Sequence, residues 1–468
     1  MSRVLALMVI LLSCVTAHAQ QLQLNKADHI CIVGNTLAER MQHDGWLETL
    51  IHAKFPEHEL VFRNLGYSGD EINGWQDPNK RLRSMSFGSQ DEWLSGVAPC
   101  PQPAKLSKRD AGKVRENRFE LTNTKADVVF AMFGYNESWA GEAGLAKFKE
   151  NADAFVKHTL GQKYNGKSAP RVVLFSPIAQ EKSSDPNLPP AADVDASNAR
   201  LKAYTGVLAD VAKANNVAFV DLFAPTLAAF AADGGPYTIN SVHLNAKGDK
   251  LVAGIAFKGL FGADAPASPA IDSLRKAVND KNFYWYNRYR VTDGYSTYGD
   301  RAFLKFSEGP GGYGDGLSNY SVGQRELDVL DTLTANRDKV VWGAAQGKQV
   351  APIDDNLPEF LQVISNKPGP LPGGKHQFLA EAETLAKLTV HKNMKVELFA
   401  DESRFPELVN PVQMAFDTKG RLWVAAWETY PHWKPTEKMD DKLLILEDTN
   451  NDGKADVCKT FAGDLHNP

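Results

Sequence analysis

The chain has 468 residues, of which 43% are hydrophobic and 23% are charged. This composition is that of a globular protein, and it excludes a disordered chain, a collagen-like repeat and a small disulfide scaffold. At about 150 residues per domain, the length predicts two to four domains. The 52 basic and 57 acidic residues give a net charge of −5. This balance argues against a nucleic-acid partner, because phosphate binding needs a clustered positive excess.

The N-terminus has the pattern of a secretory signal peptide. Arg3 supplies a positive charge, residues 4–12 form an apolar run too short to span a bilayer, and Ala17 and Ala19 fit a cleavage site. We therefore expect residues 1–19 to be removed and the mature protein to be secreted or periplasmic. An apolar first strand of the fold is the alternative. No later segment has the ~18 uninterrupted apolar residues of a transmembrane helix.

The cysteines indicate neither a metal ribbon nor a haem. Of the four in the sequence, Cys31, Cys100 and Cys458 remain after cleavage, and an odd number cannot all pair within one chain. Cys31 lies in an apolar, strand-like run and is expected in the core. Since no CxxC or CxxCH occurs, zinc-ribbon and haem-attachment motifs are both absent from the sequence.

Between residues 27 and 262, short apolar runs alternate with helical patterns. Strands are expected at 29–33, 59–64, 127–133, 171–176 and 217–222. Helices are expected at 36–55, 145–160, 196–214 and 246–260. Strands separated by helices need crossover connections and favour a buried parallel sheet. The prediction is an α/β domain built as a three-layer α/β/α sandwich, in which ligands collect beyond the carboxyl ends of the strands.

The rest of the chain divides into three predicted parts. Residues 270–350 are expected to form a helical extension whose aromatic, basic segment 283–290 packs against the α/β domain. Stacking of that segment on bases or sugars is the alternative. Residues 366–375 are rich in Pro and Gly and are predicted to be a linker. Over 385–468 the hydrophobic residues recur with a period of two, which predicts an all-β segment.

Polar residues and glycines stand where the predicted strands end. Thr36 opens a helix after the first strand, Gly69 follows the second, and Asn136 follows the third. Asn240 and His243 precede the last helix. Because parallel strands end at one edge of a sheet, we expect these five residues to converge. A hydroxyl at a helix start with a histidine nearby can serve as a nucleophile and its general base.

These blocks resemble those of the SGNH (GDSL-like) hydrolases, a family of flavodoxin-like α/β/α esterases. The resemblance covers about residues 27–262, with the blocks in the family's order and spacing. The family's Gly-Asp-Ser stands here as Gly34-Asn35-Thr36, and its second-block glycine matches Gly69. Its Gly-x-Asn-Asp matches residues 134–137, and its Asp-x-x-His matches residues 240–243.

The resemblance implies a role for each matched residue. Thr36 would be the nucleophile, His243 the general base, and Asn240 the residue that orients the imidazole. The backbone N–H groups of Thr36 and Gly69 and the side-chain amide of Asn136 would hold the oxyanion. Each such donor lowers a barrier by roughly 3–4 kcal/mol.

Two matched positions differ from the family pattern. The extra methyl group of Thr36 restricts χ1 and crowds the line of attack. Asn240 can accept a hydrogen bond from the imidazole, but its amide cannot stabilise an imidazolium by charge. Glu137 and Asp70 are carboxylates near these blocks that can replace it from another direction. Taken singly, Thr36 also fits a helix N-cap and His243 an ordinary core or surface histidine.

The sequence of 448–456 matches a calcium-binding loop. Its oxygen ligands stand at positions 1, 3, 5 and 9 around Gly453. The predicted ligands are Asp448, Asn450, Asp452 and Asp456. Lys459 occupies the place of the bidentate glutamate of an EF-hand, so the loop is not an EF-hand. A polar turn between strands is the alternative.

The segment 385–468 also resembles the opening blade of a β-propeller of the soluble sugar-dehydrogenase type, through residues 410–424. A propeller needs several blades to close, so we expect this sequence to be part of a longer protein. No cofactor site of such a propeller is carried over.

Together these patterns predict a secreted SGNH-type hydrolase that cleaves ester bonds of a small molecule or a carbohydrate, with an acyl group on a carbohydrate as the leading substrate. The alternative is a degenerate SGNH module that binds a glycan or a partner without turnover, as an accessory to a propeller oxidoreductase. No cofactor is expected for the α/β domain.

Overall fold

The computed structural model describes residues 21–72 and 124–468, apart from short gaps at 233, 292–293, 298–300, 303, 306–316, 362, 364–370 and 430–432. The chain divides into two compact units. The described part of the first spans 21–72, 124–289 and 334–354, and that of the second spans 290–333 and 355–468. Among the described helices, none is both long and apolar enough to cross a membrane.

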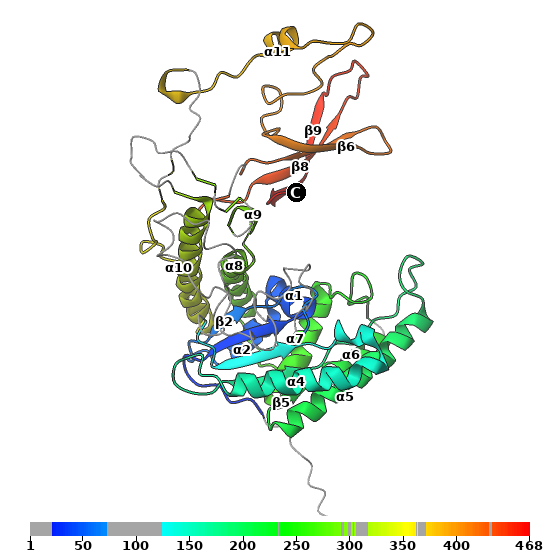
Figure 1. Cartoon of the computed structure of the whole chain (residues 1–468), viewed down its shortest axis with the longest axis vertical. Coiled ribbons are helices and arrows are strands. Elements are labelled where there is room, and N and C mark those ends of the chain that lie inside the picture. The colour runs from blue at the N-terminus through cyan, green and yellow to red at the C-terminus, as the bar shows by residue number, and fades with distance from the viewer. Residues whose placement is uncertain are drawn as a thin grey trace, which may run out of the picture. The chain divides into compact units, whose positions relative to one another are not determined.

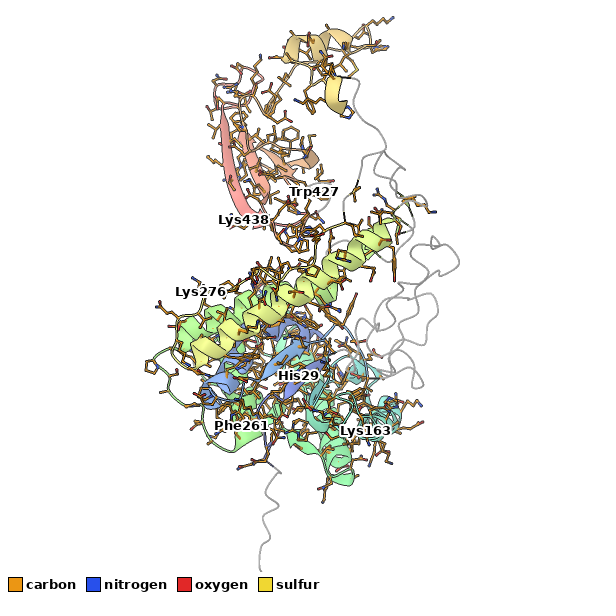
Figure 2. All side chains as sticks on the ribbon, turned by 90° about the vertical axis from the view of Figure 1, so that its left-hand side faces the viewer. His29, Lys163, Phe261, Lys276, Trp427 and Lys438 are labelled. Carbon is orange, nitrogen blue, oxygen red and sulfur yellow. The ribbon has the colours of Figure 1, made fainter. Side chains whose placement is uncertain are left out.

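The first unit is built on a sheet of five parallel strands, which confirms the predicted α/β class. They are β1 (His29–Gly34), β2 (Val61–Asn64), β3 (Val128–Met132), β4 (Arg171–Phe175) and β5 (Ala218–Val220). Their order in the sheet is β2-β1-β3-β4-β5, the flavodoxin-like order. His29, the first residue of β1, is labelled in Figure 2. The chain reverses its direction of winding between β1 and β3, where ligands bind in such folds.

Helices flank this sheet in two groups (Figure 1). In one group α1 (Thr36–Asp44), α2 (Trp46–Lys54) and α7 (Ala246–Phe261) pack together. In the other, α4 (Leu145–Leu160) packs on α5 (Ala191–Ala214). The remaining elements of this region are α6 (Phe223–Ala231) and the short 3-10 helices η2 (Glu137–Ala140) and η3 (Glu142–Gly144).

The prediction of one helix over 36–55 is wrong, because Gly45 separates α1 from α2. Its backbone is left-handed, with φ of 68°, and a Cβ there would lie 2.3 Å from Oδ1 of Asn279. Glycine is the residue that adopts this conformation without steric cost. The break therefore depends on a neighbour more than 200 positions away, which helical periodicity does not detect.

The sheet is buried on both faces, as expected for parallel strands between helices. All five residues of β3 are buried. Phe62, Phe130 and Phe175 are among the largest side chains that are completely buried. Burying each such side chain stabilises the fold by about 1.5–3 kcal/mol. Cys31 is also buried in this sheet and forms no disulfide.

Helix α8 (Ile271–Arg290) packs its aromatic residues against the end of β2. The indole N–H of Trp285 donates to the carbonyl of Asn64 at 2.6 Å, and the hydroxyl of Tyr289 donates to the carbonyl of Leu65 at 2.6 Å. These bonds hold the chain just before the loop that carries Gly69. The aromatic segment thus supports one edge of the predicted site.

The second unit contains a four-stranded antiparallel sheet, which confirms the predicted C-terminal all-β segment. Its strands, in sheet order, are β6 (Pro411–Phe416), β7 (Leu422–Ala426), β8 (Asp441–Glu447) and β9 (Val457–Leu465). Its core includes Phe405, Val424 and Leu444. The other described elements are α9 (Gly294–Thr297), part of α10 (Asn319–Ala345), η4 (Pro372–Gly374) and α11 (Glu381–Lys387). That this sheet is one blade of a β-propeller stays a prediction.

Candidate active site

The structure brings the five predicted residues of the α/β domain together at the carboxyl edge of the sheet. Thr36, Asn136 and His243 line one pocket of about 250 Å³. Gly69 contacts Thr36, and Asn240 contacts His243. The pocket adjoins the ends of β1 and β3, where the winding of the fold reverses. Residues separated by more than 200 positions in sequence therefore share one site.

Thr36 is the first residue of α1, and its hydroxyl faces the block after β2. The Oγ1 atom accepts the N–H of Gly69 at 3.0 Å. The interpretation of Thr36 as an N-cap is wrong, because Asn35 holds that position and its Oδ1 accepts the N–H of Leu37 at 3.1 Å. With the cap supplied by Asn35, the Thr36 hydroxyl is left at the positive end of the helix dipole.

Gly34 permits the turn from β1 into α1. Its φ is 142°, and a Cβ at this position would lie 2.2 Å from the carbonyl oxygen of Met132. Only glycine fits so close to the neighbouring strand. This close approach places Thr36, two residues later, near the end of β3, where Met132 lines the same pocket.

His243 is oriented by Asn240. Its Nδ1 lies 3.0 Å from Oδ1 of Asn240, and the same oxygen accepts the backbone N–H of His243 at 2.9 Å. Because this backbone donor identifies the amide oxygen, Nδ1 carries the hydrogen and Nε2 keeps its lone pair. Burial and the Arg40 guanidinium lower the pKa of His243, against an opposite effect of Glu39. A neutral imidazole with a free lone pair is the form that a general base needs.

Two donors are proposed for an oxyanion, the side-chain amide of Asn136 and the N–H of Gly69. Asn136 follows β3 and lines the pocket. The N–H of Gly69 is bonded to the Thr36 hydroxyl, so it must exchange this partner for an oxyanion during a reaction. Such an exchange makes the donor stronger in the transition state than in the ground state, which is the condition for catalysis.

Glu137 joins two of the loops around the site. Its carboxylate accepts the N–H of Ile72 at 2.9 Å and the N–H of Gly134 at 2.8 Å. Burial raises the pKa of Glu137 to about 7. In the described contacts it is Asn240, and not Glu137, that bonds to His243. Glu137 thus fixes the loop after β2 to the loop after β3.

Glu181 is a buried residue that the sequence did not single out, and it organises the loop with Asn240 and His243. Its carboxylate accepts the N–H of Tyr237 at 2.9 Å and both the N–H and the hydroxyl of Thr238, at 2.8 and 2.6 Å. Its own N–H donates to the carbonyl of Ser241 at 2.9 Å. Glu181 lies about 60 positions before this loop, and no local pattern signals the pairing.

Replacing Glu181 by alanine is expected to lower kcat for ester hydrolysis by about 10²-fold, because a shift of about 1 Å in a catalytic group has that effect. KM should change little, since the binding pocket is intact. Steady-state kinetics and the pH profile of kcat test this, with Lys182→Ala, an exposed neighbour, as control. Glu181→Gln keeps one acceptor oxygen, so its kcat should lie between that of Glu181→Ala and that of the wild type. An alanine variant with wild-type kcat and pH profile contradicts the positioning role.

The predicted calcium loop connects β8 to β9, and its acidic side chains bond within the loop. Asp448 accepts the N–H groups of Asp452 and Gly453, at 3.2 and 2.9 Å. Asp456 accepts the hydroxyl of Thr449 at 2.7 Å. In the described chain no three His, Cys, Asp or Glu side chains are grouped to hold a metal ion. Calcium binding by the loop, with Asn450 as a further ligand, stays a prediction.

The first unit brings together a helix-start hydroxyl, an oriented histidine and two amide donors at the switch point of a flavodoxin-like sheet. Residues 36–251 match the model of the GDSL-like lipase/acylhydrolase family. This region is therefore similar to the GDSL-like (SGNH) hydrolases. Residues 380–468 match a domain of unknown function, DUF7133.

Solved structures resemble about half of the chain. One is a gut microbial diltiazem-metabolizing enzyme, 15% identical, with a TM-score of 0.35, covering 51% of this chain and 48% of that one. An alpha/beta hydrolase enzyme from the metagenome of Lake Arreo, Spain, is 16% identical, with a TM-score of 0.33 and coverages of 51% and 98%. An acetylxylan esterase from Geobacillus stearothermophilus is 14% identical, with a TM-score of 0.34 and coverages of 52% and 98%. The chain spans about half the length of the first, and no curated protein matches it.

Proposed function

We propose that the α/β domain is an ester hydrolase that forms an acyl-enzyme on Thr36. The observation that carries the proposal is the single pocket shared by the Thr36 hydroxyl, the Asn240-oriented His243 and the Asn136 amide. A nucleophile, a base with a fixed tautomer and oxyanion donors are the parts that acyl transfer requires.

The reaction would proceed in two halves. Oγ1 of Thr36 attacks the ester carbonyl carbon while Nε2 of His243 takes the hydroxyl proton. Gly69 N–H and the Asn136 amide donate to the oxyanion that forms. The tetrahedral intermediate then breaks its bond to the leaving alkoxide, which receives the proton from His243. Water, activated in turn by His243, attacks the acyl-Thr36 ester and releases the carboxylic acid.

We further propose that the ester is an acyl group on a carbohydrate and that the protein is secreted. The substrate class rests on the resemblance of the sequence blocks to SGNH hydrolases. Secretion rests on the signal-peptide pattern of residues 1–19. Apolar residues that line the pocket, among them Leu37, Met41 and Ile178, suit the acyl group.

The covalent intermediate gives the direct test. The protein is mixed with p-nitrophenyl acetate, quenched in acid during turnover, digested and analysed by mass spectrometry. We expect acetyl on the peptide that contains Thr36, at its hydroxyl, and none in Thr36→Ala. Equal turnover in wild type and Thr36→Ala would rule out the proposed nucleophile.

A binding module without turnover is the second candidate, and the neutral Asn240 beside His243 favours it. An amide cannot stabilise the imidazolium that forms during acyl transfer. This candidate is preferred if the wild type is inert and the combined change of Thr36→Ser with Asn240→Asp creates esterase activity.

A further inference from the structure

Next to the pocket of the α/β domain lies a group of two aromatic side chains and an arginine, which we call the aromatic rim: Tyr135, Trp139 and Arg200. Tyr135 lines the pocket beside Asn136. The ring of Trp139 meets that of Tyr135 edge-on, with centroids 6.4 Å apart. The guanidinium of Arg200, on α5, lies 5.2 Å from the centroid of the Trp139 ring.

Trp139 is exposed, although large apolar side chains are normally buried in folded proteins. Its exposed fraction is 66%, although it is in ring contact with a pocket residue. Single exposed apolar residues are common on protein surfaces, but this one continues the wall of a catalytic pocket. An exposed indole offers a broad apolar face with an N–H at its edge, which suits a flat ligand that is both apolar and polar.

Arg200 has an uncompensated charge. In the described part of the chain it forms no ion pair; its Nη2 donates to the hydroxyl of Ser197 at 3.3 Å, and its Nε is buried without a hydrogen-bond partner. Burial raises the pKa of Tyr135 and the Arg200 guanidinium lowers it, so the cation acts on the phenol at the pocket wall. A guanidinium that forms no ion pair is well suited to a carboxylate, which can accept hydrogen bonds from its terminal N–H groups.

We infer that the aromatic rim binds the sugar that carries the ester, and that this sugar is acidic. The ring of a hexuronate would stack on Trp139, and its carboxylate would pair with Arg200. The acetylated hydroxyl would then point past Tyr135 toward Thr36. The inference rests on the proposed function, because it assigns the leaving group of that same ester.

Matched esters test the assignment. Methyl glucuronoside and methyl glucoside, each acetylated at one hydroxyl, differ only in the carboxylate, and p-nitrophenyl acetate has no sugar. Arg200→Gln is expected to lower kcat/KM for the glucuronoside about 10- to 100-fold, as expected for a lost hydrogen bond to a charged group, and to leave the other two unchanged. Trp139→Ala should lower kcat/KM for both sugar esters and leave kcat/KM for p-nitrophenyl acetate unchanged. Lys202→Gln, which removes the same charge from an exposed position on α5, is the control.

The outcomes separate this inference from the proposed function. If Arg200→Gln changes kcat/KM for all three esters alike, or for none of them, the acidic-sugar subsite is wrong, while the proposed esterase activity is unaffected by that result. If the protein hydrolyses no ester, binding is measured by tryptophan fluorescence with sodium glucuronate and with glucose. Quenching by glucuronate alone, absent in Trp139→Phe and weakened in Arg200→Gln, supports the rim without the esterase. Equal responses to both sugars overturn it.

Discussion

Replacing Asn240 by aspartate is expected to raise kcat/KM for p-nitrophenyl acetate by roughly 10³-fold at pH 7. Oδ1 of Asn240 already lies 3.0 Å from Nδ1 of His243, so a carboxylate oxygen can occupy the same place without moving the ring. The new negative charge stabilises the imidazolium as the hydroxyl proton arrives. The opposite change in a serine protease triad leaves the geometry intact and costs about 10⁴ in kcat, and the threonine here is expected to limit the gain.

The same substitution has a signature in the pH profile. Burial and Arg40 lower the pKa of His243 below its ordinary 6.5, so the wild-type kcat/KM should lose activity only at acid pH, where the base becomes protonated. A carboxylate at position 240 favours the imidazolium and moves this acid limb to higher pH. Values of kcat/KM measured between pH 4 and 9 show whether the acid limb of Asn240→Asp lies at higher pH than the acid limb of the wild type.

Asn240→Ala is the matched control, because it removes the acceptor at Nδ1 and leaves the tautomer of His243 undefined. It should be slower than wild type at every pH. If Asn240→Asp and wild type share the same rate and the same acid limb, then Asn240 does not act on His243 during catalysis.

The sheet and the convergence of the site could be predicted because both depend on local pattern and connectivity. Each strand of the sheet is a short apolar run between helices, and such runs have few other stable arrangements. Thr36, Gly69 and Asn136 each lie in the loop or helix start that comes next after a strand. Once the strands are parallel, their ends share an edge, and no further information is needed to bring these residues together.

The rest of the site depends on contacts between residues that are distant in sequence. Gly45 ends α1 where Asn279 of α8 leaves no room for a side chain, and periodicity alone extended the helix through it. Glu181 holds the His243 loop from the segment after β4. Neither has a local signature, since a buried carboxylate is recognised by the donors that surround it and not by its neighbours in the chain.

The predicted calcium loop shows why residue spacing alone leaves two uses of a loop open. The spacing of Asp448, Asp452 and Asp456 fits ion ligands, and the same short side chains also bond to nearby backbone N–H groups in turns. In the structure they make the turn bonds. Sequence spacing does not distinguish these two uses, because both need oxygen atoms at the same positions.

Replacing Lys281 by alanine is expected to lower the free energy of unfolding by about 3–5 kcal/mol, because it leaves a buried carboxylate without its counter-charge. Nζ of Lys281 lies 2.8 Å from Oε1 of Glu48, with the two side chains only 1% and 8% exposed. Burial alone would raise the pKa of Glu48, but Lys281 and His52 lower it below its usual value. Urea unfolding monitored by circular dichroism gives the change, and Lys276→Ala, an exposed lysine on the same helix (Figure 2), should leave the midpoint unchanged.

A double substitution that removes both charges separates the effect of charge from the effect of packing at this contact between α2 and α8; we call it the neutral pair. Lys281→Met combined with Glu48→Gln removes both charges at similar volume and should recover most of the loss. Since Glu48 has a lowered pKa in the folded state, its charge stabilises the protein above its unfolded pKa, and this contribution is lost as the pH falls through its folded pKa. The stability advantage of wild type over the neutral pair should therefore shrink below about pH 4.5. If Lys281→Ala and the neutral pair are equally unstable at pH 7, the loss comes from the missing ion pair itself and not from an unpaired carboxylate, because the neutral pair keeps the volume of the contact.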